Sequence, residues 1–387
     1  MGHVISAYPM VGEDATRVHL LHQNAGLHAK VSYLTWFGHA VIAFWLLLPG
    51  GAGILHAQSS TGAEHAARAA QLVQAGDLKG AEAEMRQAVE LSPKEPQYLA
   101  RLGLILGMQR RPEAAAESFE RALALDPNNL AVRRNLALSQ WQMGRLAAAR
   151  ENLDLILKAE PGDAQALLLL GMVLIDARRY AAALAVAQAA TEAMPSSYRA
   201  HAVKALAEMR MQRFTDSAKS YARAAELNPN APEVSVGLAM SLWASGSISE
   251  SFATFEQGLK RFPEDAYHCL EYGRLLLKSA KPNDSAAEAR SVALLQSALK
   301  LNSSLSGAHY LLGDLALRRG NTEAARQHLE QAVKLDPESS KIHFALFRTY
   351  RRLGRTEDAA REEEAFQKLK AKEEAAPAAP LLVGGVD

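Results

Sequence analysis

The side chains of this chain that could do chemistry include twelve histidines and one cysteine. His19, His22 and His28 lie close enough in sequence to suggest a zinc site, because imidazole is a common zinc ligand. The sequence contains no His-Glu-x-x-His, Gly-x-x-x-x-Gly-Lys or Gly-x-Ser-x-Gly motif, and the single Cys269 cannot form an internal disulfide. Three histidines in an N-terminal leader are more simply incidental, so we predict no metal, no cofactor and no enzymatic activity.

The elements that position the remaining side chains come from a repeating unit of 34 residues. Proline marks the repeat at a constant interval, and after one irregular unit it returns in register: Pro93, Pro127, Pro161, Pro195, Pro229, Pro263 and Pro337. A unit of this length with apolar residues at helical spacing forms a pair of helices that cannot bury its apolar face alone. The units must stack on one another, which predicts an all-α solenoid.

If each proline is position 32, the repeats start near residues 62, 96, 130, 164, 198, 232, 266, 306 and 340. Two positions then carry small side chains. Position 8 is Gly or Ala in all repeats except the last, which has Phe347, and position 20 is Ala or Ser in every repeat. Position 24 is mostly bulky, as in Phe119 and Leu329. Small residues opposite large ones allow two helices to approach closely at the density of a protein core.

This pattern of small residues at 8 and 20, a bulky residue at 24, alanine at 27 and proline at 32 resembles the tetratricopeptide repeat family. The resemblance covers residues 62–371 in about nine repeats, and it implies a right-handed superhelix of helix-turn-helix units. Repeat 7 departs from the pattern, because it contains six extra residues between Lys278 and Arg290 and has Ser303 in place of the proline. We expect a lengthened turn there, since loops accept insertions at little entropic cost.

Charge and composition exclude some partners. The chain has 43 Lys and Arg against 42 Asp and Glu, so no strong net charge attracts nucleic acid or an anionic membrane. We therefore predict protein partners and no nucleic acid, with membrane association only through the N-terminal segment. Residues 372–387 end in an Ala- and Pro-containing stretch, which predicts a disordered tail.

The leader, residues 1–57, does not share the repeat. Residues 31–55 contain no Asp, Glu, Lys or Arg, and nine apolar residues from Ala40 to Leu48 precede a Pro-Gly-Gly break. This pattern favours a secretory signal peptide, because a spanning helix needs about 20 apolar residues. The alternatives are an uncleaved signal anchor and a buried apolar helix of a cytoplasmic protein. A signal peptide or anchor would export the repeats, as a periplasmic or membrane-anchored protein.

The family resemblance implies that positions 2, 5, 9, 12 and 13 of each first helix line a concave groove that holds peptide segments. Arg134 and Leu277 fall at such positions. The residues predicted to contact a partner peptide are otherwise apolar: Leu104, Leu138, Trp141, Leu168, Met172, Leu206, Met209, Val236, Met240, Trp243, Leu270, Tyr310 and Phe344. Methionines and large aromatics suit a surface that accepts apolar side chains of a partner.

The same lining turns basic toward the C-terminal end. The residues predicted to form this basic end of the groove are Arg274, Lys278, Lys341, Arg348, Arg351 and Arg352. Such a cluster suits a carboxylate or an acidic segment, because hydrogen bonds between charged groups are strong. The alternative is a solvated polar cap, since a terminal repeat needs a polar outer face.

These observations predict a non-catalytic scaffold or adaptor that binds a partner segment in the groove. Binding of a glycan or cell-wall polymer through the groove aromatics is one alternative, and a role as accessory subunit of an enzyme complex is another. Self-assembly through the ends of the solenoid is a third. The sequence leaves the oligomeric state and the identity of the partner open, because repeat number and groove polarity constrain the shape of a ligand more than its identity.

Overall fold

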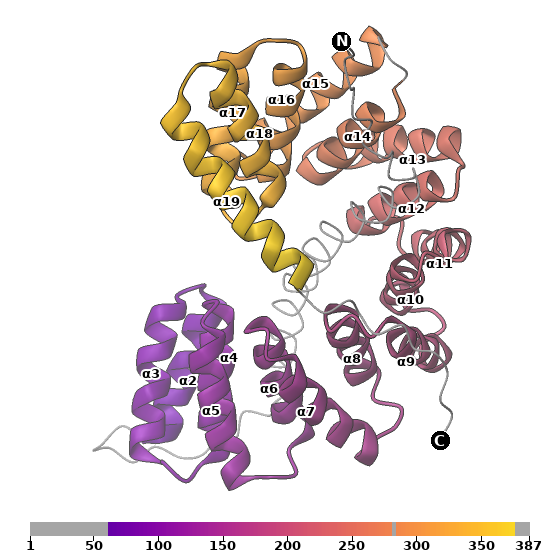
Figure 1. Ribbon diagram of the computed structural model, residues 1–387. Helices are drawn as coiled ribbons and strands as arrows, with labels where there is room; N and C mark the ends of the chain where they lie inside the picture. The colour runs from indigo at the N-terminus through magenta and orange to yellow at the C-terminus, as the bar shows by residue number, and fades with distance from the viewer. Residues whose placement is uncertain (1–60, 281–283, 376–387) are drawn as a thin grey trace, which may run out of the picture. The chain divides into compact units, whose positions relative to one another are not determined.

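The computed structural model describes residues 61–280 and 284–375. These residues form eighteen α-helices in consecutive pairs and no β-strand, as expected for an α-solenoid (Figure 1). The leader and most of the predicted tail lie outside the described residues, as do the histidines of the leader. The chain divides into two compact units at residue 229, and each unit is described by itself.

The first unit contains five helix pairs, which are repeats 1 to 5. Their helices are α2 (Gly62–Gln74), α3 (Leu78–Leu91), α4 (Pro96–Met108), α5 (Pro112–Leu125), α6 (Leu130–Gln142), α7 (Leu146–Ala159), α8 (Ala164–Asp176), α9 (Tyr180–Ala193), α10 (Tyr198–Arg210) and α11 (Phe214–Leu227).

The second unit contains four helix pairs, repeats 6 to 9. Their helices are α12 (Pro232–Ala244), α13 (Ile248–Arg261), α14 (Ala266–Ser279), α15 (Ser285–Leu301), α16 (Ser306–Arg318), α17 (Thr322–Leu335), α18 (Ser340–Arg352) and α19 (Thr356–Ala375). The last helix continues to Ala375, beyond the predicted end of the repeats at residue 371. Within the described residues, no helix is long and apolar enough to cross a membrane.

The first helix of each pair begins at the residue where the sequence places the start of a repeat. The recurring proline lies in the connection that precedes it, where the missing N–H and the ring prevent the second helix from continuing. The residue before the first helix often caps it. Asn129 and Asp163, for example, accept hydrogen bonds from the backbone N–H of Val132 and Ala166. Proline and cap together fix the register of the repeat.

The turn between the two helices of a repeat depends on position 15, which has a left-handed backbone in eight repeats. Five of these residues are glycines: Gly76, Gly144, Gly246, Gly320 and Gly354. The other three are Arg110, Arg178 and Gln212, with φ of 58° to 62°. A left-handed residue after a helix lets N–H groups of the turn bond the last free carbonyls, as Gly144 N–H does to Trp141. The turn therefore imposes strain wherever the residue is not glycine.

Replacing Gln212 or Arg178 with glycine is expected to raise the free energy of unfolding by about 1 kcal/mol, because the left-handed conformation costs other residues about 1–2 kcal/mol. Gly144→Ala should lower it by about 1 kcal/mol for the same reason. Gly107→Ala is the control, since Gly107 lies inside α4 with no atom within 4 Å of an added Cβ. Alanine there should stabilise the helix. Chemical denaturation measures the free energy of unfolding of all four variants. A lower value for Gln212→Gly than for the native chain would contradict this account of the turn.

The two helices of a repeat pack through the small and large positions that the sequence predicts. A Cβ added to Gly103 at position 8 would lie 2.6 Å from the ring of Phe119 at position 24. The same contact joins Gly313 and Leu329. In repeat 9 the sizes are reversed, because position 24 is the exposed Glu363 and position 8 is Phe347. The exception at position 8 thus occurs where no bulky residue at position 24 fills the space.

The serines at position 20 add a hydrogen bond to this close contact. Ser217, Ser251 and Ser291 are fully buried, and each Oγ donates to the backbone carbonyl at position 8 of the same repeat, at 2.7–2.8 Å. The bond satisfies a hydroxyl that would otherwise be costly to bury. Serine therefore replaces alanine at position 20 without loss of the tight packing.

The six extra residues of repeat 7 do not all enter the turn. The second helix, α15, has 17 residues where those of repeats 1 to 6 and repeat 8 have 14, and the first helix, α14, has 14 where the other first helices have 13. The N-terminus of α15 is capped by Asp284, whose carboxylate accepts the N–H of Ala287. The expected lengthened turn is therefore wrong in part. The residues that follow this cap, Ala286 to Arg290, favour helix, so most of the insertion lengthens the helices.

Candidate functional site

The first helices of successive repeats lie next to one another and form one layer within each unit. In the first unit α4 contacts α6, α6 contacts α8 and α8 contacts α10, while in the second unit α12, α14, α16 and α18 contact one another in the same order. We call positions 2, 5, 9, 12 and 13 of these helices the first-helix face. All the residues predicted to bind a partner lie on this face.

Most of the predicted groove residues are buried. In the first unit Leu104, Leu138, Trp141, Leu168, Met172, Leu206 and Met209 are each at most 9% exposed. In the second unit Val236, Met240, Trp243 and Leu270 are buried as well, whereas Tyr310 is half-buried and Phe344 is 40% exposed. Of the predicted anchors, Phe344 therefore presents the most surface.

The two tryptophans connect neighbouring repeats. The indole N–H of Trp141 donates to Asp176 Oδ2 at 2.8 Å, and the indole N–H of Trp243 donates to Ser279 Oγ at 2.7 Å. Both acceptors lie at the end of the first helix of the next repeat. Arg134 also reaches the next repeat, where it pairs with Asp163 and Gln165. These side chains thus stabilise the stacking of repeats.

The predicted basic residues have different environments. Arg274 is 6% exposed and pairs with Glu271, which is 2% exposed and lies one turn earlier on α14. Lys278 lies 4.8 Å from the ring centroid of Trp243. Arg352 donates to the backbone carbonyl of Leu317 and so joins repeat 9 to repeat 8. These contacts make Arg274 and Arg352 parts of the scaffold.

The other three basic residues lie over aromatic rings in repeats 8 and 9. Lys341 lies 5.4 Å from the ring centroid of Tyr310, Arg348 lies 5.9 Å from that of Phe344, and Arg351 lies 5.4 Å from that of Phe347. A cation over a ring is attracted by the negative charge of its face. The arrangement places a cation beside the exposed ring of Phe344 and beside the half-buried rings of Tyr310 and Phe347.

A further aromatic ring comes from the last helix. The ring centroid of Phe366 on α19 lies 5.0 Å from that of Phe344, and the ring centroid of Phe347 lies 6.1 Å from that of Phe344. We call Tyr310, Lys341, Phe344, Phe347, Arg348, Arg351 and Phe366 the aromatic–basic patch. Burial raises the pKa of the Tyr310 hydroxyl to about 12 and lowers the pKa of the Lys341 amine. Both groups are therefore partly shielded from water, and the attraction between opposite charges is stronger in such surroundings.

Models of the tetratricopeptide repeat match the chain from residue 66 to residue 380. One model matches residues 66–129, 202–266, 270–340 and 310–380, and a second matches residues 108–173 and 141–207. The chain belongs to the tetratricopeptide repeat family. Repeats of this family generally mediate protein–protein interactions and scaffolding, so this repeat chain is suited to protein partners.

Solved structures agree on the fold of the repeat chain. A tetratricopeptide repeat protein from Parabacteroides merdae is 18% identical, with 74% of this chain and 98% of that chain covered and a TM-score of 0.51. Yeast Tom70 is 14% identical, with 94% and 96% covered and a TM-score of 0.56. No curated protein matches the sequence. At these identities the likeness concerns the fold alone.

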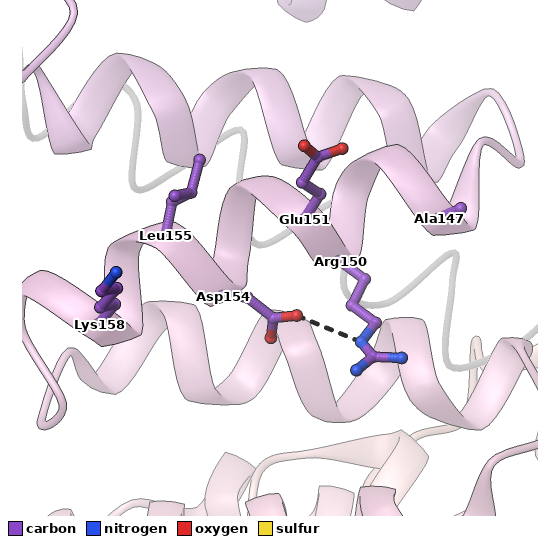
Figure 2. Close-up of a pocket in the computed structure, with 6 residues that line it drawn as sticks. All are labelled: Ala147, Arg150, Glu151, Asp154, Leu155 and Lys158. Carbon is purple, nitrogen blue, oxygen red and sulfur yellow. Dashed lines mark hydrogen bonds and ion pairs between the residues drawn. The ribbon is translucent and has the colours of Figure 1, made fainter.

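A depression on α7, the second helix of repeat 3, is a poorer candidate for a site. It is lined by Ala147, Arg150, Glu151, Asp154, Leu155 and Lys158, all from α7 (Figure 2). Arg150 and Asp154 form an ion pair of 3.3 Å along the helix. Side chains of one helix surface do not converge on a ligand, so we assign no function to this depression.

Sequence reasoning missed two members of the aromatic–basic patch. Phe347 was noted only as an exception at position 8, and Phe366 lies on a second helix, which the prediction did not consider. Phe366 is at position 27, where most of the other repeats have alanine to pack closely against the next repeat. A large aromatic at this position of the final repeat is a signal that could have identified it.

Proposed function

We propose that this tetratricopeptide repeat protein is a non-catalytic adaptor that binds an acidic segment of a partner protein at its aromatic–basic patch. The observation that carries the proposal is Phe344, an exposed aromatic ring on the first-helix face with Arg348 and Arg351 beside the ring cluster. An exposed aromatic provides apolar contact, and guanidinium groups provide paired hydrogen bonds to carboxylates. A partner segment that alternates acidic and apolar side chains fits both.

The buried residues of the first-helix face are already engaged in contacts within the solenoid, which favours the C-terminal end of the face as the site. Trp141 and Trp243 are engaged with the next repeat, and Arg274 is paired with Glu271. A partner would have to displace these contacts, whereas Phe344 and Arg351 are exposed. The C-terminal end of the face is therefore where a partner gains contacts at the lowest cost.

We also propose that the repeats act outside the cytoplasm. The support is the apolar stretch at residues 31–55 with its Pro-Gly-Gly break, which is typical of a secretory signal. A fusion of residues 1–61 to a reporter that is active only after export tests this part. Activity of the reporter supports export, and an inactive but expressed fusion contradicts it.

Charge reversal in the patch is expected to abolish partner capture. Lys341→Glu/Arg348→Glu should lower recovery of the partner by about tenfold or more, because like charges across an interface cost several kcal/mol. Lys300→Glu/Lys334→Glu is the matched control, since both of these lysines are exposed on second helices. Crosslinked complexes are purified from the cells that make the protein and quantified by mass spectrometry. Equal recovery of the partner by the native chain, the charge-reversal variant and the control variant, with unchanged thermal unfolding, would exclude the patch as the binding site.

A further inference from the structure

A side chain at position 4 of the first helix faces position 23 of the second helix in the same repeat. In repeat 1, His65 Nδ1 lies 2.7 Å from Glu84 Oε2, and in repeat 9, His343 Nδ1 lies 2.6 Å from Glu362 Oε2. In both repeats the second helix supplies a carboxylate that accepts a hydrogen bond. The geometry of the repeat therefore brings these two positions into contact.

Repeat 8 has a second histidine in place of that carboxylate. His309 of α16 and His328 of α17 face each other with their Nδ1 atoms 3.2 Å apart, and both side chains are half-buried. Their ring centroids are 5.5 Å apart. Two imidazole nitrogens from different helices thus point at the same space.

The other nitrogen of His309 is held by the backbone. In repeats 5 and 9 the Nε2 of the position-4 histidine lies 3.0 Å and 2.9 Å from the carbonyls of Pro195 and Pro337, six residues earlier. His309 has the corresponding hydrogen bond with the backbone of Ser303. A carbonyl only accepts, so by analogy with repeats 5 and 9 we infer that Nε2 of His309 carries the proton and that the lone pair of its Nδ1 faces His328.

Burial favours the neutral form of both rings. Burial lowers the pKa of His309 and of His328, and for His328 the neighbouring His309 adds to the shift. Neutral imidazole is the form that binds metal ions.

We propose that His309 and His328 form a binding site for a divalent transition metal ion, with copper(II) bound most tightly. Two nitrogens that are each about 2.0–2.1 Å from a metal are separated by about 2.9 Å in square-planar and about 3.4 Å in tetrahedral geometry. The observed 3.2 Å lies within this range. The hydrogen bond from His309 Nε2 to the backbone would orient the ring, as in other metal sites.

Water would complete the coordination. Within the described residues no group of three His, Cys, Asp or Glu side chains surrounds a common point, so the protein supplies two ligands here. With His309 in this tautomer, His328 would donate its Nδ1 proton to His309 in the metal-free site. On metal binding this proton moves to Nε2 of His328 through water, and both rings remain neutral.

The test is the number of copper(II) ions bound in equilibrium dialysis of the full chain against copper(II) chloride in a non-chelating buffer. His328→Gln is expected to bind one ion fewer than the native chain. His201→Gln is the matched control, because position 23 of its repeat is Ser220 and removal of this histidine should leave the number unchanged. Histidines elsewhere hold the same amount of copper in each variant and in the native chain. This copper therefore cancels in the difference between them.

A gain-of-site variant tests the geometry independently of any loss of folding. Glu362→His places a second imidazole opposite His343, whose Nε2 is already held by Pro337. This variant should bind one copper(II) ion more than the native chain and should unfold at a higher temperature when copper is present. Equal copper binding by the native chain, His328→Gln and Glu362→His would overturn the proposal.

Discussion

Replacing Trp141 with alanine is expected to lower the stability of the first unit by about 3–5 kcal/mol. The side chain is fully buried, and its indole N–H bonds Asp176 of the next repeat at 2.8 Å. Truncation leaves a cavity and removes a hydrogen bond between repeats, and both losses weaken the interface on which a solenoid depends. Guanidinium unfolding followed by circular dichroism measures the change.

Trp141→Phe separates the two contributions. Phenylalanine keeps most of the apolar volume but has no N–H to donate, so the expected loss is smaller, about 1–2 kcal/mol. A change below 1 kcal/mol for Trp141→Ala would show that this side chain does not join repeats 3 and 4. It would then have to be considered again as a contact for a partner.

Removing Arg274 is expected to destabilise the second unit by about 3–5 kcal/mol, because Glu271 would remain buried without its cation. Glu271 is 2% exposed, and Arg274 Nε and Nη2 both bond its Oε2. The other carboxylate oxygen, Oε1, has no hydrogen-bond partner among the described residues, so the ion pair is the main compensation for burying the charge. Thermal and denaturant unfolding of Arg274→Ala measure the loss.

The double variant Glu271→Gln/Arg274→Met is the control. It removes both charges and keeps similar volumes, and a buried ion pair is often replaced by uncharged residues at little cost. Its stability should therefore return to within about 1–2 kcal/mol of the native chain. If the double variant is as unstable as Arg274→Ala, the loss comes from packing and not from the unpaired charge.

The period and the small positions were predictable because they follow from short-range rules. Proline at position 32 cannot continue a helix, and small residues at positions 8 and 20 leave room for a bulky residue at position 24. These rules recur in most repeats, so the frame stays recognisable where one repeat departs from them, as repeat 7 does at Ser303. The helix starts at residues 96, 130 and 164 accordingly agree with the predicted frames.

The backbone of the turns was not predicted. Glycine at position 15 is a recognisable signal in five repeats, but Arg110, Arg178 and Gln212 adopt the same left-handed conformation without any signal in their residue type. The stacked helices on both sides determine the turn, and the strain is accepted because the tertiary contacts outweigh it.

Part of the proposed aromatic–basic patch was already among the residues that the sequence singled out. Position in the repeat assigned Tyr310, Lys341, Phe344, Arg348 and Arg351 to the first-helix face. In the structure Lys341 lies over Tyr310, Arg348 over Phe344 and Arg351 over Phe347. Position alone could not tell which side chains of the face pack against the next repeat. That depends on the reach of each side chain, as Trp141 shows by bonding Asp176 and Arg134 by pairing with Asp163.

The most direct test of the proposed function is photo-crosslinking from two equally exposed positions of the second unit. Phe344 is 40% exposed on the first-helix face of α18, and Leu335 is 41% exposed at the end of the second helix α17. A photoreactive phenylalanine analogue is placed at one position or the other in cells that make the protein, and the adducts are identified after irradiation. We expect a partner adduct from position 344, suppressed by Lys341→Glu/Arg348→Glu, and none of the same partner from position 335. Adducts of equal yield from both positions, or from position 335 alone, would contradict binding at the aromatic–basic patch.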